Sequence, residues 1–272
     1  MKLSVSNIAW ETVDMISHLK ILKEHGCIGM ELAPSMIWKE PIDSSKDERK
    51  SFRNLINSFG LEICSMHSLT FTRPDLHFFQ SKESKFKLIK YITDLSNLAF
   101  DLDCPILVFG SPKSRSIRNY DKDMCVEILK ESFWEIAQRI KVNGTKILIE
   151  PLGYNESDLI NTCEEGYKII DEVNHPNFKM HVDLRSTFEN KENQSKIWKN
   201  HKNQIMHCHV GNPGLQPPDK ECIEHSFASD QMRKYGYNKF ISIEMRRGEF
   251  NTQNNLKKSI SFVKREYLQC SD

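Results

Sequence analysis

Four apolar runs in the second half of the chain each end in a side chain that can bind a metal ion: Lys146-Ile-Leu-Ile-Glu150, Phe178-Lys-Met-His-Val-Asp183, Ile205-Met-His-Cys-His209 and Phe240-Ile-Ser-Ile-Glu244. Short runs rich in Ile, Val, Leu, Met and Phe are typical of buried strands. Their last residues are 33, 26 and 35 positions apart (150 to 183, 183 to 209, 209 to 244). An eight-unit βα barrel of about 250 residues averages roughly 31 residues per unit. We therefore expect four consecutive parallel strands of such a barrel.

The last residues of these runs form a donor set for a metal ion. In βα barrels the carboxyl-terminal ends of the strands form the active site, so Glu150, Asp183, His209 and Glu244 are expected to converge there. Three carboxylates and one imidazole leave positions open on a six-coordinate ion. Such oxygen-rich ligation suits Mn²⁺ or Mg²⁺ better than a closed tetrahedral zinc site does. We predict one divalent ion, with Mn²⁺ as the first choice and Mg²⁺, Co²⁺ or Zn²⁺ as alternatives.

The rest of the chain continues the alternation of strands and helices. Besides the four runs above, we expect strands at 3–8, 28–32, 61–67 and 105–109. Helices are expected at 12–25, 46–59, 82–102, 121–142, 162–173, 191–201, 218–235 and 251–267. Alternation of this kind indicates a parallel sheet covered by helices. The prediction is an α/β fold, a (β/α)8 TIM barrel that forms a single domain over residues 1–272. The chain has no G-x-G-x-x-G and no P-loop motif, so dinucleotide and P-loop functions lose their main support.

Composition excludes several other classes of protein. The 272 residues carry a net charge of +1, and 39% are hydrophobic. This balance gives no strong attraction to nucleic acid or to an anionic membrane. No run approaches the roughly 20 apolar residues that span a bilayer, and the first residues do not resemble a signal peptide. The eight cysteines show no zinc spacing, so we expect buried free thiols of a reducing compartment. Together these features predict a cytoplasmic location and no nucleic-acid or membrane partner.

Four motifs carry a resemblance to a known superfamily, and the resemblance covers almost the whole chain. They are Ile149-Glu150-Pro151, His181-Val-Asp183, His207-Cys-His209-Val and Ser242-Ile-Glu244. In order and spacing the chain resembles the xylose-isomerase-like TIM barrels, which include sugar isomerases, ketose 3-epimerases and apurinic-site endonucleases. It is most similar to the branch of sugar-phosphate isomerases/epimerases and ketose 3-epimerases.

The resemblance implies roles for individual residues. Glu150, Asp183, His209 and Glu244 would be ligands of a Mn²⁺-like ion, and Glu150 and Glu244 would also be the acid–base pair. Glu156 would steady the substrate. The chain departs from the ketose 3-epimerases at two sugar-contacting positions, where Ser186 replaces a histidine and Leu215 an arginine. These departures leave the metal site unchanged and argue against a free ketohexose as the substrate.

The chemistry that needs these groups is removal of a weakly acidic proton next to a carbonyl. A divalent ion stabilises the resulting enediolate as a Lewis acid, and a positioned carboxylate takes the proton. Two carboxylates on opposite faces of the substrate give epimerisation, and one that serves neighbouring carbons gives isomerisation. We predict a metal-dependent isomerase or epimerase of a sugar or sugar derivative. A dehydratase or lyase on the same site is the alternative. An apurinic-site endonuclease is a remote one, because Ser186 stands where a zinc-binding histidine belongs.

Further substrate contacts are expected around the strand ends. His67 follows the third expected strand and is a candidate substrate contact, with a core histidine as the alternative. Arg73 and Arg246 lie in loops after strands and could bind a phosphate or carboxylate, with solvated loops as the alternative. We therefore expect a small-molecule sugar that is phosphorylated or otherwise anionic. For the assembly we expect a homodimer or homotetramer.

Overall fold

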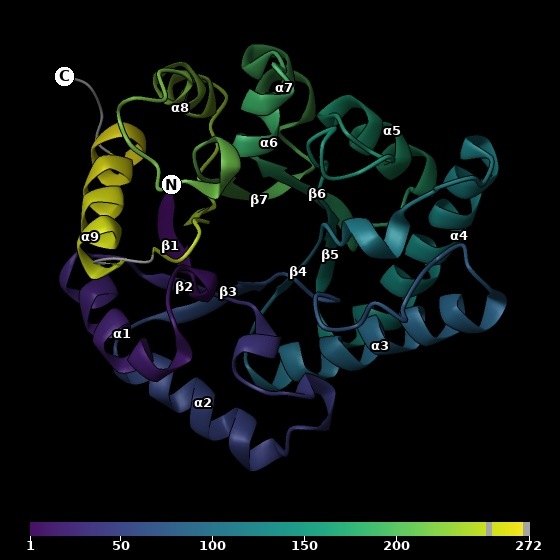
Figure 1. Ribbon diagram of the computed structural model, residues 1–272, viewed down its shortest axis with the longest axis horizontal. Coiled ribbons are helices and arrows are strands. Elements are labelled where there is room, and N and C mark those ends of the chain that lie inside the picture. The colour runs from purple at the N-terminus through teal and green to yellow at the C-terminus, as the bar shows by residue number, and fades with distance from the viewer. Residues whose placement is uncertain (249–251, 269–272) are drawn as a thin grey trace.

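Eight parallel strands close into a barrel in which each strand is hydrogen-bonded to its neighbours in chain order (Figure 1). The structure is a computed structural model, and it describes residues 1–248 and 252–268. The strands are β1 Lys2–Ser6, β2 Gly29–Leu32, β3 Glu62–Met66, β4 Ile106–Phe109, β5 Lys146–Ile149, β6 Phe178–Asp183, β7 Ile205–Val210 and β8 Phe240–Ile243. The closing pair, β1 with β8, is also parallel. The predicted TIM barrel is therefore confirmed.

Helices surround the strands on the outside of the barrel (Figure 1). They are α1 Met15–Glu24, α2 Lys46–Ser58, α3 Lys82–Asp101, α4 Lys122–Ile140, α5 Cys163–Val173, α6 Leu184–Glu189, α7 Gln194–His201, α8 Glu224–Lys234 and α9 Thr252–Val263. Short 3-10 turns lie at Asn7–Ala9, Thr12–Asp14, Pro34–Met36, Pro41–Asp43, Pro112–Arg115, Lys141–Asn143 and Pro213–Leu215, and a π turn at Lys264–Leu268. Capping boxes formed by Ser45 and Thr162 fix where α2 and α5 begin, since each hydroxyl accepts a hydrogen bond from the first turn.

Three expected helices have different bounds in the structure. The sequence predicted one helix at 191–201 after β6, but α6 comes first, directly after Asp183, whose side chain caps it. The helix expected at 218–235 begins only at Glu224. The helix expected at 12–25 opens with a 3-10 turn and becomes α-helical at Met15. For the last helix, the expected start at residue 251 lies outside the described residues.

Alternation along each strand decides which side chains enter the barrel. On β5, Ile147 and Ile149 belong to the main core shared with the helices. Leu148 belongs to a separate small cluster with Ile106 and Val108 of β4, which fills the barrel interior. Successive side chains of a strand point to opposite faces, so Lys146 and Glu150 lie on the same inner face as Leu148.

Two further predictions concern the state of the cysteines and the presence of membrane-spanning helices. Seven described cysteines are free thiols, and six of them are buried, as the sequence predicted. The eighth, Cys270, lies outside the described residues. Among the helices that the structure describes, none has the length and apolarity needed to cross a membrane.

Candidate metal centre

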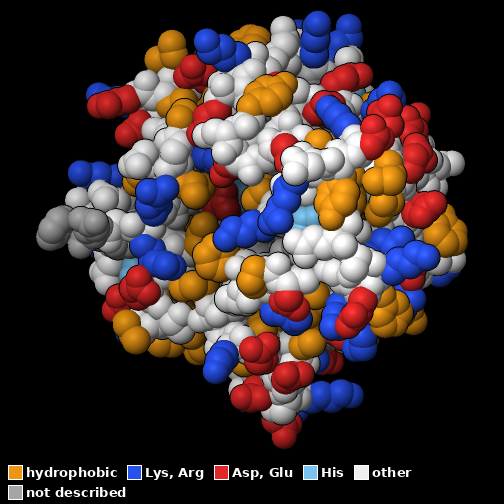
Figure 2. All heavy atoms as spheres, turned by 45° about the vertical axis from the view of Figure 1, so that its right-hand side comes forward, with side chains coloured by type: hydrophobic (Ala, Val, Ile, Leu, Met, Phe, Trp, Pro, Cys, Tyr) orange, Lys and Arg blue, Asp and Glu red, His pale blue; other side chains and the backbone are white. Residues whose placement is uncertain are grey.

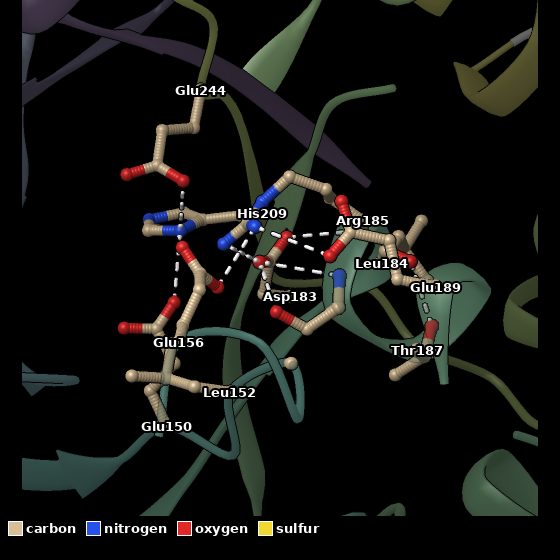
Figure 3. A network of polar contacts seen from close by, with 12 residues as sticks. Glu150, Leu152, Glu156, Asp183, Leu184, Arg185, Thr187, Glu189, His209 and Glu244 are labelled. Atoms are coloured by element: carbon tan, nitrogen blue, oxygen red, sulfur yellow. Dashed lines mark hydrogen bonds and ion pairs between the residues drawn. The ribbon is translucent and has the colours of Figure 1, made fainter. Parts of the chain in front are cut away.

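The structure brings the four predicted ligands together at the carboxyl-terminal end of the barrel (Figure 3). Asp183, His209 and Glu244 offer ligand atoms that all lie within 4.8 Å of one another. Glu150 directly follows β5, and its Oε1 lies 3.4 Å from His209 Nδ1. Oε2 of Glu244 lies 3.3 Å from the same nitrogen. Four successive strands thus deliver three carboxylates and one imidazole to one place.

His209 is the centre of this cluster and is completely buried. Its Nδ1 faces the oxygens of Glu150 and Glu244, yet it forms no hydrogen bond with any described residue. Buried polar atoms almost always have a partner, so an unpartnered nitrogen between two carboxylates needs an explanation. A divalent cation coordinated by these groups would supply it. The residues therefore fit the ion that the donor set implies.

Electrostatics at the cluster favours positive charge. Burial would lower the pKa of His209, but the carboxylates of Glu31, Glu244 and Glu150 outweigh burial and raise the pKa well above its ordinary value. Burial likewise would raise the pKa of Glu244, but His209 and His67 hold it well below its ordinary value. Burial is the main reason why the pKa of Glu150 is raised. The two glutamates beside His209 thus have different proton affinities.

Asp183 is held firmly because it also caps a helix. Its carboxylate accepts hydrogen bonds from the backbone of Arg185 (3.0 Å) and Ser186 (3.3 Å) at the start of α6. The Ser186 hydroxyl donates a third at 2.7 Å, and Arg185 Nη2 forms an ion pair at 2.9 Å. Ser186, which the sequence suggested as a lost sugar contact, therefore orients a ligand candidate.

Gly110 makes room for one of the glutamates. A Cβ at this position would lie 2.3 Å from Glu150 Oε2, closer than two atoms can approach. Any other residue at the end of β4 would therefore displace the Glu150 carboxylate.

Two of the predicted substrate contacts lie next to the ligand candidates. His67 Nδ1 is 3.3 Å from Glu244 Oε1, and its Nε2 is 2.6 Å from the Ser6 hydroxyl. Glu156 pairs with Arg185, with 2.8 Å between Oε2 and Nη1 (Figure 3). The Glu156 side chain is 32% exposed, so it can reach a bound molecule. Figure 2 shows a hollow on the molecular face, crossed by basic side chains, with a histidine visible inside.

The two predicted anion contacts are placed differently. Arg73 donates two hydrogen bonds to Asp75 and lies over the ring of Tyr91. The Arg246 side chain is exposed, and its backbone N–H donates to Leu215. Within the described part of the chain, neither guanidinium forms a hydrogen bond or ion pair with the four ligand candidates. Their role toward a substrate stays a prediction.

Glu31 is a site residue that the sequence interpretation missed. It is completely buried on β2, and its Oε1 accepts hydrogen bonds from Ser65 (2.8 Å) and His207 (3.0 Å). Its Oε2 lies 2.9 Å from His209 Nε2. The available signal was a single carboxylate inside the apolar run Ile28-Gly-Met-Glu-Leu32. A charged side chain in a buried strand needs polar or oppositely charged partners, so Glu31 indicated a cluster of polar residues inside the barrel.

Comparisons with known proteins agree with this architecture. Residues 19–266 match the family described as "Xylose isomerase-like TIM barrel". Among similar solved structures are the apo 3-keto-D-glucoside 4-epimerase of E. coli (TM-score 0.83, 15% identity, 97% of this chain and 99% of that one) and the D-psicose 3-epimerase of Clostridium cellulolyticum H10 with D-tagatose (0.81, 18%, 99% and 100%). A family 2 AP endonuclease of Brucella melitensis is also similar (0.74, 16%, 97% and 97%).

The three structural likenesses have low sequence identity and establish the fold alone. No protein of curated function matches the sequence. The family match covers most of the chain, and the closed eight-stranded barrel agrees with it. The chain therefore belongs to the xylose isomerase-like TIM barrel family.

Proposed function

We propose that the protein is a divalent-metal-dependent isomerase or epimerase of a sugar or sugar derivative, which moves a proton next to a carbonyl. The observation that carries the proposal is the buried, unpartnered Nδ1 of His209 between the carboxylates of Glu150 and Glu244. The epimerase names of two structural neighbours agree with it. An ion would be held by these three residues and Asp183, with Mn²⁺ as the first choice.

When bound, the ion would act as a Lewis acid that stabilises the negative charge left on the substrate, which contributes several kcal/mol. The chain's own residues move the proton. Glu150 and Glu244 approach His209 Nδ1 from different strands, and together they are the proposed acid–base pair.

His67 and Glu156 are the proposed substrate contacts. His67 lies against Glu244, and Glu156 pairs with Arg185, which itself pairs with Asp183. Of the two arginines predicted to bind an anion, Arg73 is engaged by Asp75. An anionic substrate therefore depends on Arg246, which is exposed just after β8.

The experiment that tests the proposal uses Mn²⁺-reconstituted protein in D₂O with free sugars, sugar phosphates, sugar acids and nucleotide-linked sugars. NMR should show deuterium at the carbon next to the carbonyl of the true substrate, together with an epimer or isomer. Glu244→Gln is the matched control and should show uptake slowed by roughly 10²–10⁴-fold. Complete retention of hydrogen over many turnovers would contradict the proposal. A deoxy-keto product would instead assign the dehydratase chemistry, and three zinc ions per chain would favour the nuclease.

A further inference from the structure

A second polar group of residues lies one layer below the candidate metal centre, inside the barrel. Glu31, Ser65 and His207 are all completely buried, and they are connected through Glu31 Oε1. The other oxygen of this carboxylate, Oε2, is 2.9 Å from His209 Nε2. The two atoms are within hydrogen-bond distance, although the N–H is not aligned with this oxygen in the described structure. His209 thus has one ring nitrogen toward the metal centre and the other toward Glu31.

An imidazole that binds a metal must present a lone pair on one nitrogen, and its other nitrogen then carries the proton. Which nitrogen does which is set by the hydrogen bond of the one that faces away from the metal. At His209 the nitrogen beside Glu150 and Glu244 is Nδ1, and the nitrogen beside Glu31 is Nε2. A carboxylate can only accept, so it selects the form with the proton on Nε2 and the lone pair on Nδ1.

We propose that Glu31 is a positioning residue for metal binding, which holds His209 in the tautomer and orientation that direct its Nδ1 at the ion. This inference rests on the proposed metal site, and it goes beyond that site because it assigns a role to a residue outside the proposed ligand set. Glu31 acts through His209 alone.

The chemistry of Glu31 explains why a carboxylate is needed here. Oε1 is already engaged by Ser65 and His207, so Oε2 is the oxygen available to His209. A carboxylate has two accepting oxygens. A glutamine has only one, so either His207 or His209 would lose its acceptor.

The test compares Mn²⁺ affinity, measured by calorimetry on EDTA-stripped protein, in wild type and four variants. Loss of a carboxylate partner of a ligating histidine typically weakens metal binding by about 10–100-fold, and we expect this for Glu31→Gln. Glu31→Asp keeps the charge but shortens the reach, so we expect an intermediate loss. Ser65→Ala leaves the carboxylate less firmly held and should lose less again. Ser242→Ala is the matched control, because Ser242 is equally buried inside the barrel and forms no hydrogen bond with Glu31.

A spectroscopic readout separates positioning from general stability. In Zn²⁺-loaded, ¹⁵N-labelled protein, NMR should show the His209 proton on Nε2. The resonance of this proton should lie further downfield in wild type than in Ser65→Ala and Glu31→Asp. A proton on Nδ1 in wild type would overturn the proposal. Wild-type Mn²⁺ affinity in Glu31→Gln would also overturn it. So would weakened affinity in Glu31→Gln together with wild-type affinity in Glu31→Asp, since the charge of residue 31 alone would then explain the loss. If Glu31→Gln does not fold, Glu31→Asp and Ser65→Ala decide the question. Wild type that binds no ion would instead refute the proposed function.

Discussion

The two ends of the barrel interior carry opposite charge, although the same strands build both. On β5 the inner face begins with Lys146 and is followed by Glu150, and on β6 it begins with Lys179 and ends with Asp183. At the amino-terminal end, Lys179 donates to Gln204 and Lys239 donates to the backbone carbonyl of Ile205. Lys179 and Lys239 thus have partners within the protein.

The carboxyl-terminal end differs in what it leaves unsatisfied. There the imidazole of His209 is buried among carboxylates without a hydrogen-bond partner in the described residues. A cavity of about 420 Å³ lies at the amino-terminal end, where Lys2, Lys146 and Lys239 line it together with the carboxylates of Glu62 and Asp103. In barrels of this kind, strand carboxyl ends carry activity and amino ends carry stability.

The largest expected effect is loss of the metal. Asp183→Ala or His209→Ala should reduce bound Mn²⁺ from about one ion per chain to none, because each removes a ligand that no neighbour replaces. Elemental analysis after dialysis against Mn²⁺ measures this. Full Mn²⁺ occupancy in both variants would show that these residues do not bind the ion, and the carboxyl-terminal end would then not be the metal site.

The next effect is on proton transfer. Glu244→Gln should slow deuterium uptake into the substrate by roughly 10²–10⁴-fold, the usual contribution of a positioned acid or base. NMR in D₂O measures the rate, and circular dichroism confirms that the fold is kept. Uptake at the wild-type rate would show that Glu244 is at most a ligand.

A smaller effect concerns stability and pH at the carboxyl-terminal end. Burial raises the pKa of Glu192 from 4.5 to about 7, and its carboxylate accepts a hydrogen bond from the backbone of Cys163 at the start of α5. A raised folded-state pKa contributes stability that is complete below about pH 4.5 and is lost as pH rises toward 7. The size is on the order of 3 kcal/mol. Denaturant unfolding of Glu192→Gln between these pH values should show a weaker decline than wild type, and an unchanged slope would contradict the assignment.

The smallest effect is expected at the amino-terminal end. Burial, with the charge of Lys146, lowers the pKa values of Lys179 and Lys239. Lys146→Met removes this repulsion, so the melting temperature should stay the same or rise by a few degrees, with Mn²⁺ affinity within twofold of wild type. A loss of metal binding in this variant would show that the two ends are coupled.

The sequence predicted the barrel and the four ligand candidates because both follow from local patterns. A run such as Lys146–Ile149 followed by Glu150 predicts a strand and where it ends, even when the neighbouring strands are not known. The start of α6 was missed because it depends on the Asp183 side chain folding back onto Arg185 and Ser186.

Glu31 was missed for a different reason. Its partners Ser65 and His207 are 34 and 176 residues away in the chain, so only the closed barrel shows that they meet. Arg73 shows the converse, since the carboxylate that engages it, Asp75, is two residues away and could have been foreseen. Contacts across the barrel interior therefore depend on the fold, whereas the order of the strand ends does not.

The most direct test of the account is anomalous diffraction from a crystal soaked in Mn²⁺. We predict one strong peak at the carboxyl-terminal end, within bonding distance of His209 Nδ1 and of carboxylate oxygens from Glu150, Asp183 and Glu244. A peak located instead at the amino-terminal end, several peaks of equal height, or no peak at His209 would contradict the central claim that these four residues form one metal site.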